Sequence, residues 1–430
     1  VFGATVLRDV IQRHRLQDAT LALVDLNEEV VGMMAALGRR MAADLNVDCS
    51  ISAHRDRLEA LPESDFVILS ACPQGERRWK MDCDILEQAG LPGQRRECGG
   101  LGGLSNALRA ISLALDVCRD IERHCPKALL LDVTNPMPRV VTAVNRFTTV
   151  KAYGFCNAAF GGPIGYDHTG FYFVRNPVGY DGIAGELGRN SADLEVITAG
   201  MNHFAWLVTV KDCQTGQDLT ADLHDAVRRR TGLDAAILST WLDTYGALAM
   251  SGVHHQSEYM SPDPRIVYHS HSPYHGAGDI GKQHRERLRA VVNGQAEWQA
   301  LVAEGSWEHP VDVAVAWAGG VECCPHMINL PNQGCLSDVP AGRIVEGPAN
   351  VRSGVIQGLE VGRLPGKAGE LCRLVSDVHE LVAAGAALGS REKLAAAIEA
   401  DMAIPEKKMA IAALDLLLDA HRDILPRFHA

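Results

Sequence analysis

Polar residues that follow two short strand-like runs of the sequence are the first candidates for chemistry. Asn135 comes after the run at residues 128–133, and Cys156 and Asn157 come after a second run at 150–155. In open α/β sheets, ligands bind in the crevice at the carboxyl ends of the strands. We therefore expect the side chains of Asn135 and Cys156 to face one crevice, and Cys156 is the cysteine whose position suggests chemistry.

Histidines form a second group of candidates. His203 interrupts an apolar stretch at 194–207, where a histidine is more often a hydrogen-bonded core residue. A later loop holds five histidines within 22 residues: His254, His255, His269, His271 and His275. This density indicates a polar cleft or a metal site. The HxxxH spacing from His271 to His275 spans Pro273, and HExxH is absent, so no zinc-protease helix is predicted.

Alternating strands and helices must position these side chains. The continuous apolar run at 128–133 predicts a parallel strand with both faces covered by helices. Further short strands are predicted at 19–24, 48–53, 65–70 and 150–155. Helical spacing lies between them, most clearly at 105–125 and 139–146. The pattern predicts an α/β fold with a Rossmann-like parallel sheet domain.

The start of the chain resembles the second half of a βαβ nucleotide-binding unit. A helical pattern at 1–14 precedes the strand 19–24, which ends at Asp25. In such units an acidic residue at the strand end accepts hydrogen bonds from a ribose, although this position is also commonly a helix cap. The first strand and its glycine-rich phosphate turn are expected before Val1.

The rest of the chain does not continue this alternation of strands and helices. The segment 72–103 ends in a cluster of four glycines at 99, 100, 102 and 103, too many for a helix interior, which predicts either a ligand-approaching loop or a mobile surface loop. Later segments predict an α+β second domain, with helices at 219–230, 280–304 and 371–425 and strands within 327–346. We predict a nucleotide-binding domain at 1–160 and a substrate, metal-binding and oligomerisation domain at 161–430.

Composition narrows the class of protein. The 430 residues are 47% hydrophobic and 22% charged, as in an ordinary globular protein, and the net charge of -12 argues against a nucleic-acid partner. The sequence shows no signal peptide and no apolar run of membrane-spanning length, so no membrane association is expected. Twelve cysteines without regular spacing indicate reduced thiols and a cytoplasmic location.

Several short motifs, taken in order, resemble glycoside hydrolase family 4. The central matches are Thr134-Asn135-Pro136, Gly154-Phe155-Cys156-Asn157 and Gly200-Met201-Asn202-His203-Phe204. Further matches are Phe2-Gly3-Ala4, Leu23-Val24-Asp25, Gly93-Gln94, Leu330-Pro331-Asn332-Gln333-Gly334 and Ile344-Val345-Glu346-Gly347-Pro348. This family comprises NAD-dependent, divalent-metal-dependent glycosidases related in fold to lactate and malate dehydrogenases.

The resemblance implies a redox-elimination mechanism with NAD and a divalent metal, usually manganese, as cofactors. NAD⁺ takes a hydride from sugar C3, and the resulting ketone acidifies the C2 proton, which a base removes. Elimination then expels the C1 substituent, water adds back, and the hydride returns. The family therefore does not follow the two-carboxylate scheme of most glycosidases. It also implies a small-molecule glycoside substrate and a homo-oligomer, either a dimer or a tetramer.

The same resemblance assigns roles to residues. Cys156 and His203 match the metal ligands, and Asn135 matches the asparagine between cofactor and sugar. Asn202 is carried over as substrate-binding, and Asp25 matches the ribose-binding acid. Arg77, Arg78, Arg95 and Arg96 are candidates for contacting an anionic sugar substituent, although such arginines are commonly surface charge.

Two departures from the family pattern affect the chemistry. Asn157 stands where a His or Asp commonly protonates the leaving group, and an amide cannot act as a general acid. Val253 stands where an aspartate base is expected, which leaves His254, His255 and Tyr259 as candidate bases. A dehydrogenase with net NADH release, acting on a sugar or hydroxy acid, and a non-catalytic sugar- or nucleotide-binding homologue therefore remain alternatives.

Overall fold

The amino-terminal part of the chain is a parallel α/β structure in the computed structural model, which describes residues 2–156, 158, 181–266, 279–302 and 308–429. Five strands follow the predicted order: β1 (Ala19–Val24), β2 (Cys49–His54), β3 (Phe66–Leu69), β4 (Leu129–Asp132) and β5 (Lys151–Gly154). β1 pairs with β2, and β4 pairs with both β3 and β5, always in parallel. The predicted α/β fold class is confirmed.

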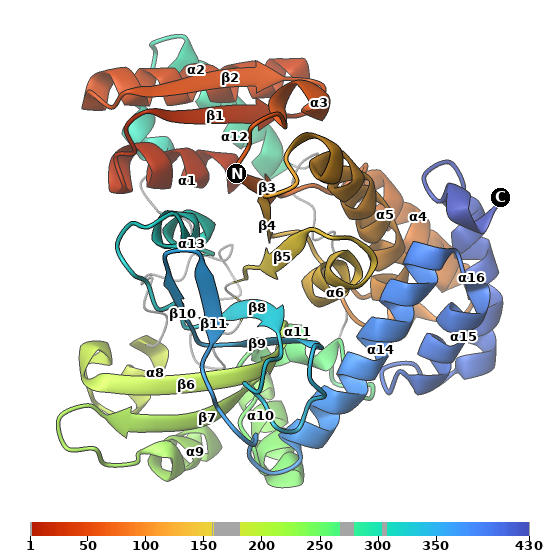
Figure 1. Cartoon of the computed structure of the whole chain (residues 1–430). Coiled ribbons are helices and arrows are strands. Elements are labelled where there is room, and N and C mark those ends of the chain that lie inside the picture. Colours follow the sequence, from red (N-terminus) through yellow and green to blue (C-terminus); the bar gives the residue numbers. More distant parts are fainter. Residues whose placement is uncertain (1, 157, 159–180, 267–278, 303–307, 430) are drawn as a thin grey trace.

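The two parallel pieces are not hydrogen-bonded to each other in the described part of the chain. β1 and β3 each have one edge that pairs with no described strand. Figure 1 shows β1 and β2 with α1 (Phe2–Arg8), α2 (Glu28–Leu45) and α12 (Asp279–Val292) at one end of the molecule, apart from β3–β5.

A mixed sheet continues from the parallel strands into the second half of the chain. Its order is β3-β4-β5-β8-β9-β6-β7, with β6 (Leu194–Met201), β7 (Phe204–Asp212), β8 (Ile328–Pro331) and β9 (Ile344–Gly347). β5 is antiparallel to β8, and β6 is antiparallel to both β7 and β9. The sheet is therefore continuous across residue 160, and the division into two domains stays a prediction.

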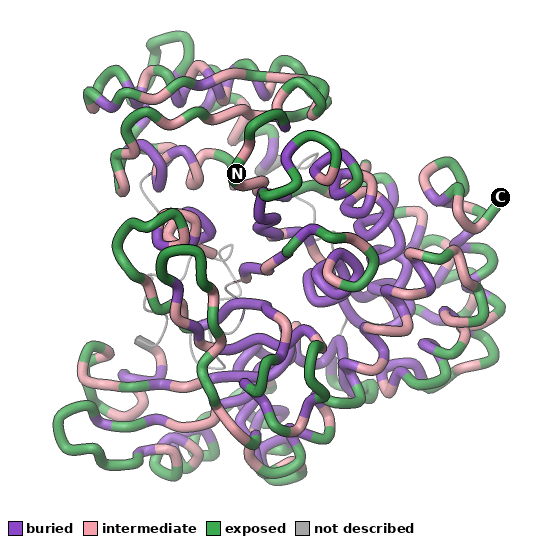
Figure 2. The backbone as a smooth tube through the Cα atoms, in the orientation of Figure 1, coloured by how far each residue is buried: buried purple, intermediate pink, exposed green. Residues whose placement is uncertain are grey.

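Six helices pack together beside the parallel strands, and those at residues 100–124 and 137–147 are largely buried (Figure 2). They are α4 (Gly75–Gln88), α5 (Gly100–His124), α6 (Met137–Phe147), α14 (Ala368–Leu388), α15 (Arg391–Ala400) and α16 (Lys407–Ala420). Within the described residues, α5 alone has the length and hydropathy of a membrane-spanning helix, and 83% of its most apolar window is buried. Burial of this extent is typical of a core helix.

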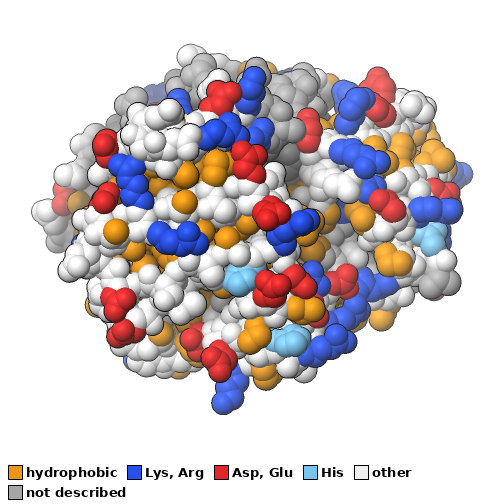
Figure 3. All heavy atoms as spheres, turned by 90° about the horizontal axis from the view of Figure 1, so that it is seen from above, with side chains coloured by type: hydrophobic (Ala, Val, Ile, Leu, Met, Phe, Trp, Pro, Cys, Tyr) orange, Lys and Arg blue, Asp and Glu red, His pale blue; other side chains and the backbone are white. Residues whose placement is uncertain are grey.

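The remaining α-helices and strands lie around the mixed sheet, except the helix at residues 57–60, which packs against β1 and β2. They are α3 (Arg57–Ala60), α8 (Asp181–Glu186), α9 (Thr220–Arg229), α10 (Leu233–Tyr245), α11 (Gly252–Ser257), α13 (Pro310–Trp317), β10 (Ala349–Arg352) and β11 (Val355–Gly358). On the face shown in Figure 3, acidic and basic side chains are interspersed, with hydrophobic side chains between them. All twelve cysteines carry free thiols.

The prediction of a loop at 72–103 was wrong. Residues 75–88 form α4, and three of the four glycines lie in the first turn of α5, which begins at Gly100. Close packing explains these glycines: a Cβ on Gly99 would overlap the backbone carbonyl of Glu258. The Glu258 carboxylate in turn accepts hydrogen bonds from the backbone N–H groups of residues 97, 98 and 99.

A substitution tests this packing. We expect Gly99→Ala to lower the free energy of unfolding by about 1–3 kcal/mol, because the backbone of Glu258 cannot move aside as a flexible side chain can. Urea denaturation measures the change. Gly93→Ala is the matched control, since nothing lies within 4 Å of a Cβ there. Equal stability of the two variants would contradict the packing argument.

Candidate functional site

The structure brings Cys156 and His203 together. Cys156 follows β5, whereas His203 lies in the two-residue turn between β6 and β7 and has a φ of 60°. Cys156 Sγ lies 3.4 Å from His203 Nε2, although 47 residues separate them in the chain. Zinc-like bonds of about 2.3 Å to sulfur and about 2.0–2.1 Å to nitrogen would place the two ligand atoms roughly 3.1–3.6 Å apart at ordinary coordination angles. The pair therefore fits one metal ion.

The electrostatic surroundings of Cys156 are those of a buried thiol. Burial and the nearby Glu346 carboxylate raise the pKa of the Cys156 thiol to about 12. A hydrogen bond from the Asn202 side chain lowers this pKa but does not offset the rise. A bound divalent cation reverses such a shift, because a coordinating thiol is deprotonated outright. Among the described residues, no set of three or more His, Cys, Asp or Glu side chains gathers around a possible metal position. Water and substrate oxygens would have to complete the coordination of a metal held by this pair.

Asn202 is fixed beside this pair by a carboxylate that the sequence interpretation did not select. Its Nδ2 donates to Glu346 Oε1 at 2.9 Å, and Asn329 Nδ2 donates to the same oxygen at 2.9 Å. Glu346 is 1% exposed, and burial raises its pKa to about 7 although both amides oppose the shift. In the sequence, Glu346 lies in the matching motif at 344–348, as an acidic residue inside an apolar strand pattern, but the motif assigned it no role.

Asn135 lies at the carboxyl end of β4, as predicted. It precedes a cis peptide bond to Pro136, and its Nδ2 donates to Glu97 Oε1 at 3.1 Å. Asn135 Oδ1 is buried and accepts no hydrogen bond from the described residues. Glu97 therefore fixes the Nδ2 side of the Asn135 carboxamide, and the Oδ1 atom can accept a hydrogen bond from a ligand.

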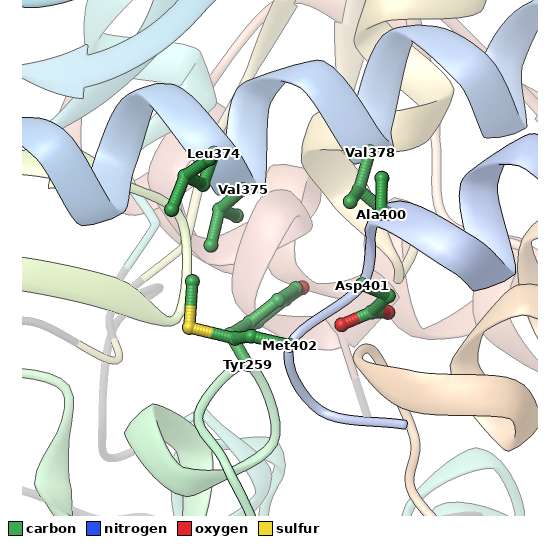
Figure 4. A pocket seen from close by; sticks show the side chains of 7 residues that line it. All are labelled: Tyr259, Leu374, Val375, Val378, Ala400, Asp401 and Met402. Atoms are coloured by element: carbon green, nitrogen blue, oxygen red, sulfur yellow. The ribbon is translucent and has the colours of Figure 1, made fainter. Parts of the chain in front are cut away.

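The three candidate bases have different surroundings. The His255 ring lies 4.4 Å from the His203 ring, centroid to centroid, and His255 is half-buried, whereas His254 is exposed. Tyr259 is buried, packs against Phe204 and His379, and lines a small cavity beneath α14 together with Asp401 (Figure 4). Burial raises the pKa of Tyr259 well above its ordinary value. The His255 ring thus contacts the His203 ring of the Cys156–His203 pair.

Other predicted positions are less informative. Asp25 is exposed at the end of β1, and its carboxylate accepts a hydrogen bond from the backbone N–H of Asn27. Asn27 is the residue that caps the amino terminus of α2. Asp25 is therefore not the helix cap, and ribose binding stays a prediction. Asn157 and three loop histidines, His269, His271 and His275, lie outside the described residues.

The four arginines considered for an anionic substituent have partners within the protein. Arg78 is 1% exposed and bonded to Asp423, and Arg96 is fully buried and donates to the carbonyl oxygens of residues 257, 258 and 260. Arg77 donates to Gln74, and Arg95 pairs with Glu87. Arg78 and Arg96 are structural residues in this fold.

Comparison with known proteins decides the family. A family model described as family 4 glycosyl hydrolase matches residues 1–164, and the model of the C-terminal domain of that family matches residues 198–404. The chain belongs to glycoside hydrolase family 4. The predicted resemblance is thereby confirmed along most of the sequence.

Relatives within family 4 are similar over nearly the whole chain. An α-glucosidase of Erwinia rhapontici is 24% identical, over 94% of this chain and 93% of that protein. A 6-phospho-α-glucosidase from gut microorganisms, solved with NAD and glucose-6-phosphate, has a TM-score of 0.79 at 18% identity, covering 99% of this chain and 96% of that one. The 6-phospho-β-glucosidase of Thermotoga maritima, solved with manganese, NAD⁺ and glucose-6-phosphate, has a TM-score of 0.73 at 18% identity, covering 98% and 95%. These structures confirm the fold.

Proposed function

We propose that this protein is an NAD- and divalent-metal-dependent glycosidase that acts by transient oxidation at sugar C3, elimination and addition of water. The observation that carries the proposal is the 3.4 Å approach of Cys156 Sγ to His203 Nε2, from two strands that are not neighbours in the sheet. Membership of family 4, with relatives solved with NAD and manganese, supports it.

The residues take the following roles in this proposal. Cys156 and His203 hold the metal, proposed to be manganese, since a mixed set of sulfur, nitrogen and oxygen ligands suits a borderline divalent ion. Asp25 accepts hydrogen bonds from the ribose hydroxyls of NAD, and Asn135 and Asn202 orient the sugar. When bound, the nicotinamide supplies hydride transfer at C3, and the metal supplies Lewis-acid stabilisation of negative charge on the C2 and C3 oxygens.

We assign the removal of the C2 proton to His255. Its ring adjoins His203, and an imidazole needs little pKa adjustment to act as a base near neutral pH. Tyr259 is a poor base here, because its buried hydroxyl holds its proton well above neutral pH. Asn157 cannot protonate a leaving group, so substrates with good leaving groups, such as aryl glycosides, should react best.

Substitution of the candidate bases tests this assignment. We expect His255→Ala to lower kcat for aryl glycosides by about 10²–10⁴-fold, the usual contribution of a general base. His254→Ala is the control on the same helix, and its kcat should stay within a few-fold of the parent value, because His254 is exposed. Loss of activity in Tyr259→Phe with retention in His255→Ala would instead make the tyrosine the base.

Dependence on the cofactors tests the function itself. We expect hydrolysis of a panel of aryl α- and β-glycosides, with 6-hydroxyl, 6-phosphate and 6-carboxylate forms, to require both NAD⁺ and Mn²⁺ under reducing conditions. Chelation of the metal should stop cleavage, and added Mn²⁺ should restore it, without net NADH. Cleavage that needs neither addition would contradict the proposal. Accumulation of NADH without cleavage would indicate that the protein is a dehydrogenase. Binding of a sugar or nucleotide without turnover would indicate a non-catalytic homologue.

A further inference from the structure

A row of four residues crosses the mixed sheet between the strands that carry Cys156 and His203. Gly154 on β5 pairs with Asn329 on β8, Asn329 pairs with Glu346 on β9, and Glu346 pairs with Gly200 on β6. The pairs at the two ends are the single register positions that join β5 to β8 and β6 to β9. The position of Cys156 relative to His203 therefore depends on this row.

The side chains of the row reinforce its backbone pairing. Glu346 Oε1 accepts one hydrogen bond from Asn329 and one from Asn202, each 2.9 Å long. Asn329 Nδ2 also lies 3.4 Å from the carbonyl oxygen of Gly154, two residues before Cys156. One carboxylate oxygen thus connects the strand that leads to Cys156 with the turn that holds His203.

Burial makes these hydrogen bonds strong. Asn329 is fully buried, and Asn202 and Glu346 are each 1% exposed. Hydrogen bonds to an ionised acceptor are roughly twice as strong as neutral ones, and a low local dielectric strengthens them further. A buried carboxylate held by two amides therefore restricts the orientation of Asn202, and through the chain that of the neighbouring His203.

Close packing restricts the other end of the row. A Cβ on Gly154 would lie 2.7 Å from Met137 Sδ and 3.0 Å from Asn329 Cβ. Both distances are shorter than ordinary van der Waals contact, so only glycine lets β5 approach β8 this closely. This packing fixes the spacing of β5 and β8 at the Gly154 end of the row.

We propose that Glu346 is a positioning residue for the Cys156–His203 metal site: by bonding Asn202 and Asn329 together, it sets the separation of the two ligand side chains. This inference rests on the metal site of the proposed function. Carboxylates and amides that orient ligands typically contribute 10–100-fold to metal affinity. Glu346 Oε2 and Asn202 Oδ1 accept no hydrogen bond from the described residues and retain capacity for a water or a sugar hydroxyl.

Metal binding by the whole protein, measured without NAD or sugar, tests the proposal. Co²⁺ serves as the probe, because its bond to a thiolate gives a charge-transfer absorption band, and the measurements are made at one pH above about 7, the pKa of Glu346. We expect Glu346→Gln to weaken Co²⁺ binding by about tenfold or more, since the amides of Asn202 and Asn329 would then meet a neutral acceptor. Thermal unfolding is recorded in parallel.

Asn332→Ala is the matched control for a purely structural effect. Asn332 is a buried amide that follows β8, and its Nδ2 donates to the carbonyl oxygens of Leu336 and Val339, within its own loop. We expect this variant to lose thermal stability while keeping the parent affinity for Co²⁺. If Glu346→Gln likewise lowers the melting temperature but keeps the parent affinity, Glu346 is a structural residue and the proposal is overturned.

A second variant keeps the test decisive if Glu346→Gln fails to fold. Gly154→Ala should displace the strand end that carries Cys156 and weaken Co²⁺ binding by a similar factor. Unchanged affinity in folded Gly154→Ala protein would overturn the role of the row. Cys156→Ser separates this failure from failure of the proposed function: if the parent protein shows no absorption band that depends on Cys156, the metal site itself is wrong.

Discussion

Replacing Cys156 by serine is expected to lower both metal affinity and glycoside cleavage by at least about a hundredfold, because residues that only orient a ligand already contribute 10–100-fold. His203→Ala should have an effect of the same size, since the two side chains would share one ion across their 3.4 Å separation. Isothermal titration with Mn²⁺ and the rate of aryl glycoside cleavage measure the two effects. The losses in metal affinity and in rate should agree between the two variants.

An exposed cysteine provides the control for this experiment. Cys213→Ser changes an exposed thiol that follows β7, at the opposite end of that strand from His203, and we expect the parent values for both metal binding and rate. Full activity in both Cys156→Ser and His203→Ala would mean that the proposed metal site is wrong. Activity lost only in Cys156→Ser, with metal binding intact, would point to a different role for the thiol.

Replacing Asp82 by alanine is expected to lower the free energy of unfolding by about 3–5 kcal/mol, the usual cost of removing one partner from a buried ion pair. Asp82 Oδ2 lies 2.8 Å from Arg109 Nη2, and Asp82 Oδ1 lies 2.7 Å from His421 Nε2. Asp82, Arg109 and His421 are each at most 1% exposed. The variant would leave the Arg109 guanidinium buried without its carboxylate, and urea denaturation measures the change.

Asp84 provides a control on the same helix. It pairs with Lys80 at 2.7 Å, but both side chains are more than half exposed, so Asp84→Ala should change stability by no more than about 1 kcal/mol.

The effect of Asp82 should also depend on pH. Burial alone would raise the pKa of Asp82, but Arg109 and His421 hold this pKa below its ordinary value.

The sign of the pH dependence follows from this lowered pKa. The contribution of Asp82 is fully present above its pKa in the unfolded chain, about 3.9, and is lost as the pH falls through the lower folded value. The parent protein and Asp82→Ala should therefore differ most in stability near neutral pH and converge in acid. A difference that stays constant down to pH 2 would contradict the ionic account.

Local sequence patterns determined the regular elements of the amino-terminal half. β1 has the predicted bounds, and β2 to β5 differ from prediction by one residue at each end. β1, β3 and β4 are short, largely apolar runs, and this pattern depends only on neighbours in the chain. The glycines at 99–103 were misread, because their reason is the long-range contact of Gly99 with the backbone of Glu258.

The sequence by itself also determined the family and the identity of the candidate metal ligands, because short motifs such as those around Cys156 and His203 keep their order along the chain. Only the tertiary structure decided which side chains meet. Pairing of β5 with β8 and of β6 with β9 brings Cys156 to His203 and makes Glu346 the connection between them. Burial also distinguishes two candidate bases: His255 is half-buried with its ring against His203, whereas Tyr259 is buried. Such contacts form between strands distant in sequence, where the periodicity of neighbouring residues carries no information about distance.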